Sequence, residues 1–164
     1  MRLPEYIFFL LLSNGFCAFS QKPELVIPTG NLAEITSIAY SGDGKYIASG
    51  GYDFCIKLWD AETGDELKIF SFFKDHVTAL IFTSDSKHII AGSRDGKIIC
   101  IDILTSDTLY TLRHNDCITS LHLSKNGKYL LSSSWDKTAK LWNLDTEKVY
   151  KSYRCKSRLN FADF

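Results

Sequence analysis

The stretch "SSSWDKTAKLWN" at Ser132–Asn143 decides how this chain folds, because a polar turn there leads into a strand whose side chains alternate. Related stretches occur twice earlier, as "SGGYDFCIKLWD" at Ser49–Asp60 and "AGSRDGKIICID" at Ala91–Asp102. Each copy places an aspartate in the turn and a large apolar residue near the end of the strand. The chain therefore contains three versions of one structural unit.

Three independent landmarks repeat with the same spacing of 42 and then 41 residues. The first landmark is the start of an alternating segment, at Ile35, Val77 and Ile118. The second is the turn aspartate, at Asp53, Asp95 and Asp136. The third is the apolar residue that follows it, at Trp59, Ile101 and Trp142. A period of forty-odd residues indicates a repeat architecture.

The short-range period within each unit is two, which predicts strands instead of helices. Expected strands cover 35–40, 46–50, 55–59 and 66–71 in unit one; 77–82, 88–92, 97–102 and 107–112 in unit two; and 118–123, 129–133, 138–142 and 147–153 in unit three. Four short antiparallel strands per unit are typical of one propeller blade. A helical solenoid is disfavoured, because no window sustains apolar spacing at i, i+3 and i+4.

The predicted fold class is therefore all-β, a partial β-propeller of four-stranded antiparallel blades. The repeats are expected at about 30–67, 68–109 and 110–149, with a fourth blade begun in 150–164. Three blades and part of a fourth cannot close a ring of ordinary blade number. The sequence favours a fragment of a longer protein over two alternatives, self-association through open blade edges and a four-bladed ring.

The first 20 residues have several interpretations. Arg2, the apolar run 6–12 and the small residues Ala18 and Ser20 fit a signal peptide cleaved before Gln21. The apolar runs 6–12 and 16–19 would alternatively be two extra strands, or the reading frame starts wrongly. Residues 24–29 resemble a lone outer strand ahead of unit one.

Charge and cysteine content exclude several classes of protein. Nineteen basic residues balance nineteen acidic ones, so net charge indicates neither nucleic acid nor an anionic membrane surface as a partner. The N-terminal apolar run is too short for a membrane span. The five cysteines form no CxxC pair, and reduced thiols favour the cytoplasm or nucleus; a cleaved signal peptide would instead place the protein in the secretory pathway.

No motif of catalysis or cofactor binding is present. The sequence contains no nucleophile elbow, phosphate loop, HExxH or EF-hand loop. The four histidines are scattered, and no set of four ligands converges for zinc. We therefore expect no enzyme activity, no cofactor and no metal site.

The repeated residues resemble the WD-repeat β-propeller family, whose blades carry Gly-His before the first strand and Ser-x-Asp at the turn from the second to the third strand, and whose third strand ends in Trp-Asp. Unit three matches best, and the resemblance implies a buried hydrogen-bond chain of His114, Ser134, Asp136 and Trp142. The other units keep only parts of this network: Asp53 and Trp59 in unit one, Ser93 and Asp95 in unit two. Phe73 stands where unit two would have its histidine.

The resemblance also implies a platform that binds other proteins or peptides. In the family, the residue before the turn aspartate points to that surface, which here gives Tyr52, Arg94 and Trp135. Tyrosine, arginine and tryptophan are enriched at binding hot spots. The expected function is a non-catalytic scaffold; the alternative is an accessory substrate-binding module of an enzyme whose catalytic part lies outside this chain.

Overall fold

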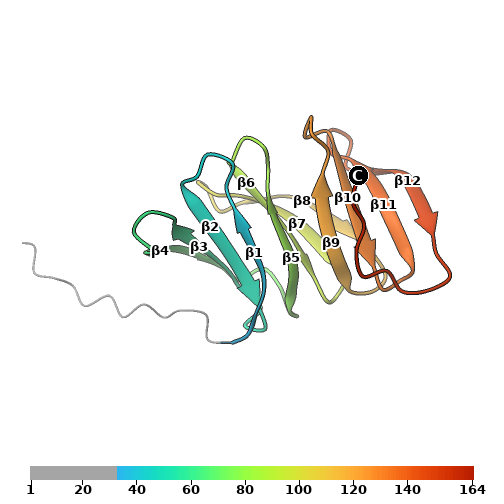
Figure 1. Ribbon diagram of the computed structural model, residues 1–164, viewed down its shortest axis with the longest axis horizontal. Coiled ribbons are helices and arrows are strands. Elements are labelled where there is room, and N and C mark those ends of the chain that lie inside the picture. The colour runs from blue at the N-terminus through green and yellow to red at the C-terminus, as the bar shows by residue number, and fades with distance from the viewer. Residues whose placement is uncertain (1–32) are drawn as a thin grey trace, which may run out of the picture.

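The computed structural model describes residues 33–164, in which every regular element is a β-strand (Figure 1). Blade 1 contains β1 (Ile35–Tyr40), β2 (Tyr46–Gly51), β3 (Ile56–Asp60) and β4 (Glu66–Phe70). Blade 2 contains β5 (Val77–Phe82), β6 (His88–Ser93), β7 (Lys97–Asp102) and β8 (Thr108–Arg113). Blade 3 contains β9 (Ile118–Leu123), β10 (Tyr129–Ser134), β11 (Thr138–Asn143) and β12 (Lys148–Arg154).

Each blade is an antiparallel meander whose strands pair in chain order. The twelve expected strands are confirmed, and every observed boundary lies within one residue of its expected position. The expected signal peptide or extra strands at 1–20, and the outer strand at 24–29, lie outside the described residues. From residue 33 onward, no helix is long and apolar enough to cross a membrane.

Blade 2 is buried on both faces, which explains why its strands are apolar at consecutive positions. In β7, Ile99 and Ile101 pack in the cluster shared with blade 1, whereas Ile98 and Cys100 pack in the cluster shared with blade 3. Successive strand residues point to opposite faces, so a strand packed on both sides must be apolar throughout. The three sheets lie side by side in the order of the chain (Figure 1).

Neighbouring blades also pack tightly where the second strand of one blade meets the first strand of the next. A Cβ atom at Gly50 would lie 2.6 Å from Val77 Cγ1, and one at Gly92 would lie 2.5 Å from Ile118 Cγ2. Atoms this close would overlap, so both positions require glycine. The packing of one blade on the next therefore depends on glycine, which has no side chain, at these two positions.

Side-chain hydrogen bonds join the first strands of blades 1 and 2. The Thr36 hydroxyl donates to the Val77 carbonyl, and the Leu80 amide donates to Ser37 Oγ at 2.9 Å. The same contacts recur at the end of the described chain: Thr119 Oγ1 donates to the Leu159 carbonyl at 2.9 Å, and the Ala162 amide donates to Ser120 Oγ at 3.0 Å.

Residues 159–164 thus occupy the place expected for the first strand of a fourth blade, but they form no strand. A strand needs a backbone ladder. The first strand of each blade pairs with the second strand of its own blade, as β9 pairs with β10, and the described residues contain no such second strand for 159–164. The segment is held instead by side-chain bonds from β9. The expected first strand of a fourth blade is not formed, and residues 148–154 belong to blade 3 as β12; the fourth blade itself stays a prediction.

Candidate binding surface and its supporting network

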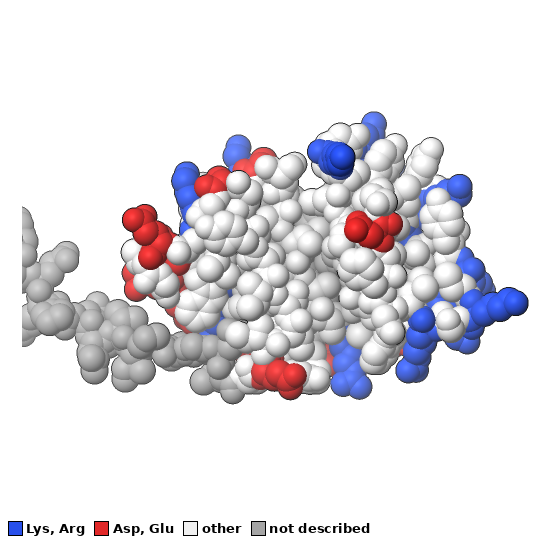
Figure 2. All heavy atoms as spheres, viewed as in Figure 1, with Lys and Arg blue, Asp and Glu red and all other residues white. Residues whose placement is uncertain are grey.

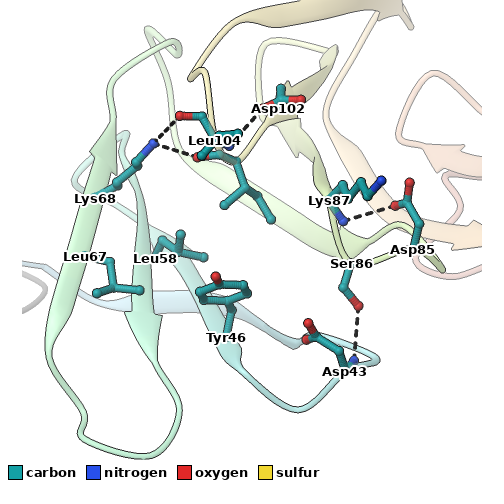
Figure 3. A pocket seen from close by; sticks show the side chains of 11 residues that line it. Asp43, Tyr46, Leu58, Leu67, Lys68, Asp85, Ser86, Lys87, Asp102 and Leu104 are labelled. Atoms are coloured by element: carbon teal, nitrogen blue, oxygen red, sulfur yellow. Dashed lines mark hydrogen bonds between the residues drawn. The ribbon is translucent and has the colours of Figure 1, made fainter.

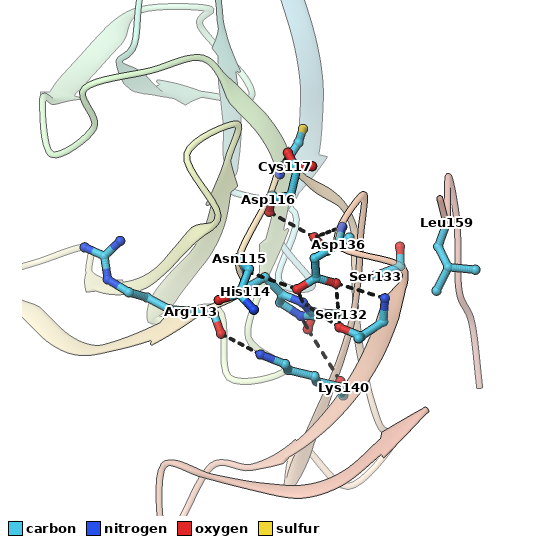
Figure 4. A network of polar contacts seen from close by, with 12 residues as sticks. Arg113, His114, Asn115, Asp116, Cys117, Ser132, Ser133, Asp136, Lys140 and Leu159 are labelled. Carbon is cyan, nitrogen blue, oxygen red and sulfur yellow. Dashed lines mark hydrogen bonds and ion pairs between the residues drawn. The ribbon is translucent and has the colours of Figure 1, made fainter. Parts of the chain in front are cut away.

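The turn between β10 and β11 is held by a chain of buried hydrogen bonds (Figure 4). Trp142 Nε1 donates to Ser132 Oγ at 2.7 Å, and Ser132 Oγ lies 2.7 Å from His114 Nε2. The other ring nitrogen, His114 Nδ1, lies 2.9 Å from Asp136 Oδ2. The His114 side chain is fully buried and that of Asp136 is 7% exposed. The chain links the start of blade 3 to two of its strands and their turn.

The serine expected in this chain, Ser134, is the wrong one, because Ser132 lies between His114 and Trp142. Ser134 serves the turn itself: its hydroxyl donates to the Asp116 carbonyl at 2.9 Å and accepts from the Asp136 amide at 3.1 Å. Both serines are fully buried. One residue, Ser133, separates them, and only Ser132 reaches the indole.

Donor and acceptor roles in this chain are satisfied by a neutral imidazole. A neutral imidazole with its proton on Nδ1 fits these contacts, because Nδ1 then donates to the Asp136 carboxylate and Nε2 accepts from the Ser132 hydroxyl, which itself accepts from Trp142 Nε1. Burial and the nearby Lys140 ammonium lower the pKa of His114, and this outweighs the opposite effect of Asp136. His114 is therefore uncharged at neutral pH, and its contact with Asp136 is a hydrogen bond, not an ion pair.

Asp136 is ionised and collects donors from three sides. Partial burial raises the pKa of its carboxyl, but hydrogen bonds from the Thr138 hydroxyl, the Asn115 amide and His114 together lower it well below its usual range. Those bonds measure 2.6 Å from Thr138 Oγ1 and 3.0 Å from the Asn115 amide. A buried carboxylate with this many donors stabilises the turn.

Blades 1 and 2 retain fragments of the network. In blade 1, Trp59 Nε1 donates to Ser49 Oγ at 2.8 Å, and Asp53 accepts from the Cys55 amide at 3.4 Å. In blade 2, the Ser93 hydroxyl donates to Asp95, which also accepts from the Lys97 amide at 3.0 Å.

Phe73 takes the histidine position of blade 2. The residue is buried in the core cluster between blades 1 and 2, with the Lys97 ammonium 5.7 Å from its ring centroid. Blade 2 therefore replaces the polar chain by apolar packing, in agreement with its isoleucine at 101 where the other blades have tryptophan.

The three residues expected at the binding surface line one groove. Tyr52, Arg94 and Trp135 come from the equivalent turns of the three blades, β2–β3, β6–β7 and β10–β11. They share a groove of about 480 Å³. Its other lining residues come from the innermost strands, the loops before them and the C-terminal segment: Thr36, His76, Thr78, Cys117, Ile118, Thr119 and Asn160. We call this set the rim groove.

Aromatic and cationic contacts hold the side chains of the rim groove in place. The Tyr52 ring meets His76 edge-on with centroids 4.0 Å apart, and Phe54 stacks on the same imidazole at 5.3 Å. The Arg158 guanidinium lies 4.9 Å from the centroid of the Trp135 ring. Cys117 is 4% exposed, and burial raises the pKa of its thiol, so the groove presents no reactive thiolate.

A larger cleft of about 680 Å³ lies between blades 1 and 2 at the other end of the strands (Figure 3). Its polar groups already have partners: Lys68 Nζ donates to the carbonyls of Ile103 and Leu104, both at 2.7 Å. Asp102 accepts from the amides of Leu104 and Thr105, both at 2.8 Å. The Asp102 contacts stabilise a turn, and the Lys68 contacts join blade 1 to blade 2. We therefore assign the cleft a structural role.

Sequence reasoning missed the structural role of the residue that ends the third strand of each blade. Asp60, Asp102 and Asn143 each accept hydrogen bonds from two backbone amides of the following turn. These amide bonds lower the pKa of Asp60 and of Asp102. The signal was available, because aspartate and asparagine recur at this position with the period of the repeat.

The described residues contain no group of three His, Cys, Asp or Glu side chains that could hold a metal ion. Cys55, Cys100, Cys117 and Cys155 are all free thiols. The rim groove therefore offers aromatic rings and one guanidinium, which suit non-covalent binding.

Comparison with known proteins agrees with this geometry. The family model "WD domain, G-beta repeat" matches residues 21–60, 66–102 and 106–143. The chain is 28% identical over 153 residues to Protein ROOT INITIATION DEFECTIVE 3 of Arabidopsis thaliana, covering 85% of this chain and 35% of that protein. It is 29% identical over 125 residues to the guanine nucleotide-binding protein subunit beta of Oryza sativa subsp. indica, covering 69% and 33%.

Among solved structures, that of U3-55K superposes with a TM-score of 0.75 at 24% identity, covering 80% of this chain and 42% of that one. At this level of identity the similarity shows the fold. The chain spans about a third of the length of the curated relatives named above.

Proposed function

The chain belongs to the WD-repeat family, and on that premise we propose that it is a non-catalytic scaffold whose rim groove binds a segment of a partner protein. One observation carries the proposal: Tyr52, Arg94 and Trp135 come from three different blades and line one groove. Aromatic residues and arginine dominate the energetics of protein interfaces. A groove of about 480 Å³ also falls in the size range of ordinary ligand sites.

The lining indicates which kind of peptide fits. Trp135 and Tyr52 offer flat apolar surface for one large side chain of the partner. Arg94 is exposed and offers a guanidinium to a carboxylate or phosphate. The hydroxyls of Thr78 and Thr119 are committed to the protein, since they bond the Gly92 carbonyl and the Leu159 carbonyl. We therefore expect an extended peptide with an apolar anchor next to an acidic residue.

The variety of the curated relatives supports a role in binding partners more than a role in one shared enzymatic reaction. Their names include Pre-rRNA-processing protein IPI3 of Mycosarcoma maydis and Autophagy-related protein 16 of Arabidopsis thaliana. A fold shared by proteins with such different names is used as a platform, and its partner is set by surface residues. Free cysteines in the described part of the chain support a cytoplasmic or nuclear location.

A displayed peptide library, selected on the purified chain, tests this proposal. We expect selected peptides to lose at least tenfold in affinity with Trp135→Ala, and with Arg94→Ala when they carry an acidic residue. Leu104→Ala is the control: this residue is 85% exposed on the cleft at the other end of the strands. Peptides that bind all variants equally, or that lose affinity only with Leu104→Ala, would refute the rim groove as the site.

A further inference from the structure

The outer edge of blade 3 is basic in a way that the repeat does not require. Residues 148–158 contain Lys148, Lys151, Arg154, Lys156 and Arg158 and no acidic residue. All five are exposed. We call them the basic edge. In Figure 2, Lys and Arg gather on the side of blade 3, whereas acidic side chains gather at blade 1.

The equivalent segments of the other blades provide an internal comparison. Residues 65–75 of blade 1 carry two lysines and three acidic residues, and 107–117 of blade 2 carry one arginine and two aspartates. The three segments have the same place in the fold and only one is cationic. The net charge of the whole chain is zero, so it does not reveal that positive charge is concentrated in this one segment.

Protection of an exposed strand edge does not account for the pattern. Lysines do prevent edge-to-edge pairing of sheets. However, β4 and β8 are also edge strands, and they carry one cation each, Lys68 and Arg113. Tyr150 and Tyr153 are 65% and 45% exposed between the cations of β12, and exposed aromatic rings oppose such protection.

The cations and rings of β12 are arranged along a track. Lys151 and Tyr153 pair with Leu141 and Ala139, whereas Arg154 pairs with Thr138 and points to the other face. Because β12 is the outermost strand of its sheet, side chains from both faces reach its free edge. The strand has seven residues and extends about 23 Å.

The track continues to the rim groove. After β12 the chain turns toward Trp135, where Arg158 lies over the indole ring. Lys151 lies similarly over Tyr153, with its ammonium 5.1 Å from the ring centroid. Cations thus alternate with aromatic faces from Lys148 to the rim of the blade. Proteins bind single-stranded nucleic acids by placing cations along the phosphate backbone and aromatic side chains against the bases.

We propose that the basic edge binds a single-stranded nucleic acid, with the lysines and arginines on phosphates and Tyr150 and Tyr153 stacking on bases. An acidic peptide would also be attracted by the cations, but its carboxylates would not stack on the exposed rings as bases do. Arg158 contacts Trp135, but none of the five cations lines the rim groove and the proposed ligands differ, so either proposal can fail alone.

Fluorescence anisotropy of the full chain with labelled 15-mer oligo(U) and oligo(dT), over a range of salt concentrations, tests the proposal. The variant is the triple substitution Lys148→Thr, Lys151→Thr and Arg154→Thr, because threonine suits an exposed strand. The control is the triple Lys45→Thr, Lys87→Thr and Lys128→Thr, which removes the same charge from exposed turn lysines of the three blades.

We expect the edge triple to weaken binding at least tenfold and the control triple by less than threefold. The slope of log affinity against log salt should fall by about 2 in the edge triple, at about 0.7 per phosphate contact. Tyr150→Thr should weaken binding and leave that slope unchanged. Tighter binding of oligo(U) than oligo(dT) would identify RNA as the ligand, and the reverse DNA.

Three results would overturn the proposal. The first is no binding of either oligonucleotide at low salt. The second is equal loss in the two triples, which would mean unspecific attraction. The third is competition by polyglutamate as effective as by the oligonucleotide at equal charge, together with no effect of Tyr150→Thr; that result would assign the edge to acidic proteins.

Discussion

At the scale of single residues, the turn of blade 3 depends on a polar chain in which every buried group has a partner. Asp136 accepts from His114, the Asn115 amide and Thr138, whereas Asp95 in blade 2 is exposed and has no histidine beside it. Removing one member of a buried network leaves its partners unsatisfied, and this costs more than the lost bond contributes.

We therefore predict that Asp136→Ala lowers the free energy of unfolding by about 2–4 kcal/mol, and that Asp95→Ala lowers it by less. Urea titration followed by tryptophan fluorescence measures both values. Because Phe73 replaces the histidine in blade 2, Asp95 has fewer buried donors to leave unpaired. Equal losses at the two positions would show that the network in blade 3 adds nothing to an ordinary turn.

The two titrating members of the network should make stability fall with acidification. Since the pKa of His114 is lower in the folded state, the unfolded state takes up this proton first as pH drops below about 6.5. The lowered pKa of Asp136 adds a further loss as pH falls below about 3.9. Both contributions are fully present at neutral pH.

Urea titrations at pH 7 and pH 5 test the part that belongs to His114. We expect a smaller free energy of unfolding at pH 5, and a smaller drop in the variant His114→Phe, which copies the residue found in blade 2. A chain that becomes more stable at pH 5 would mean that Asp136 favours the imidazolium and that the contact is an ion pair.

At the scale of elements, Gly50 and Gly92 leave room for Val77 and Ile118 of the next blade. We predict that Gly92→Ala lowers the free energy of unfolding by about 1–3 kcal/mol, because its Cβ would overlap Ile118 and force the strands apart. Thermal unfolding checks this value. Combined with Gly92→Ala, the change Ile118→Val keeps the Cγ2 atom that lies 2.5 Å from the added Cβ, whereas Ile118→Ala removes it and leaves only the Cβ contact at 2.9 Å.

If Ile118→Ala relieved none of the loss caused by Gly92→Ala, the overlap would not be its cause. The comparison is made relative to Ile118→Ala alone, since that change has its own cost as a truncation in the core.

The same scale shows what the sequence can and cannot predict. Strand positions follow from the period of two and from turn residues, which are local, so all twelve strands could be placed within one residue. Ser132 and Ser134 point to the same face of β10, so alternation could not distinguish them. The useful signal was a ten-residue spacing, Ser49 to Trp59 and Ser132 to Trp142, with Ala91 before Ile101.

Other features depend on contacts that no local pattern encodes. The residues before the turn aspartates were predictable as a set, but their meeting in one groove requires the packing angle between blades. The basic edge was visible in the sequence, yet its importance emerged only when equivalent strands could be compared in space. Residues 159–164 follow the repeat in spacing, and lack the ladder that would make them a strand.

At the scale of the whole molecule, the three blades stabilise one another unequally. Blade 2 is packed on both faces, whereas β1 and β12 leave large apolar side chains exposed, including Ile38 and Tyr150. Strands buried on both sides open only with global unfolding, whereas outer strands open locally. The packing of the three blades on one another holds Tyr52, Arg94 and Trp135 at fixed positions around the rim groove.

Amide hydrogen exchange of the purified chain, followed by mass spectrometry, tests this arrangement most directly. We expect the slowest exchange in β6 and β7, intermediate exchange in β10 and β11, and the fastest exchange in β4 and β12. Uniform protection across all twelve strands, or faster exchange in β6 and β7 than in β12, would contradict three blades packed face to face in chain order.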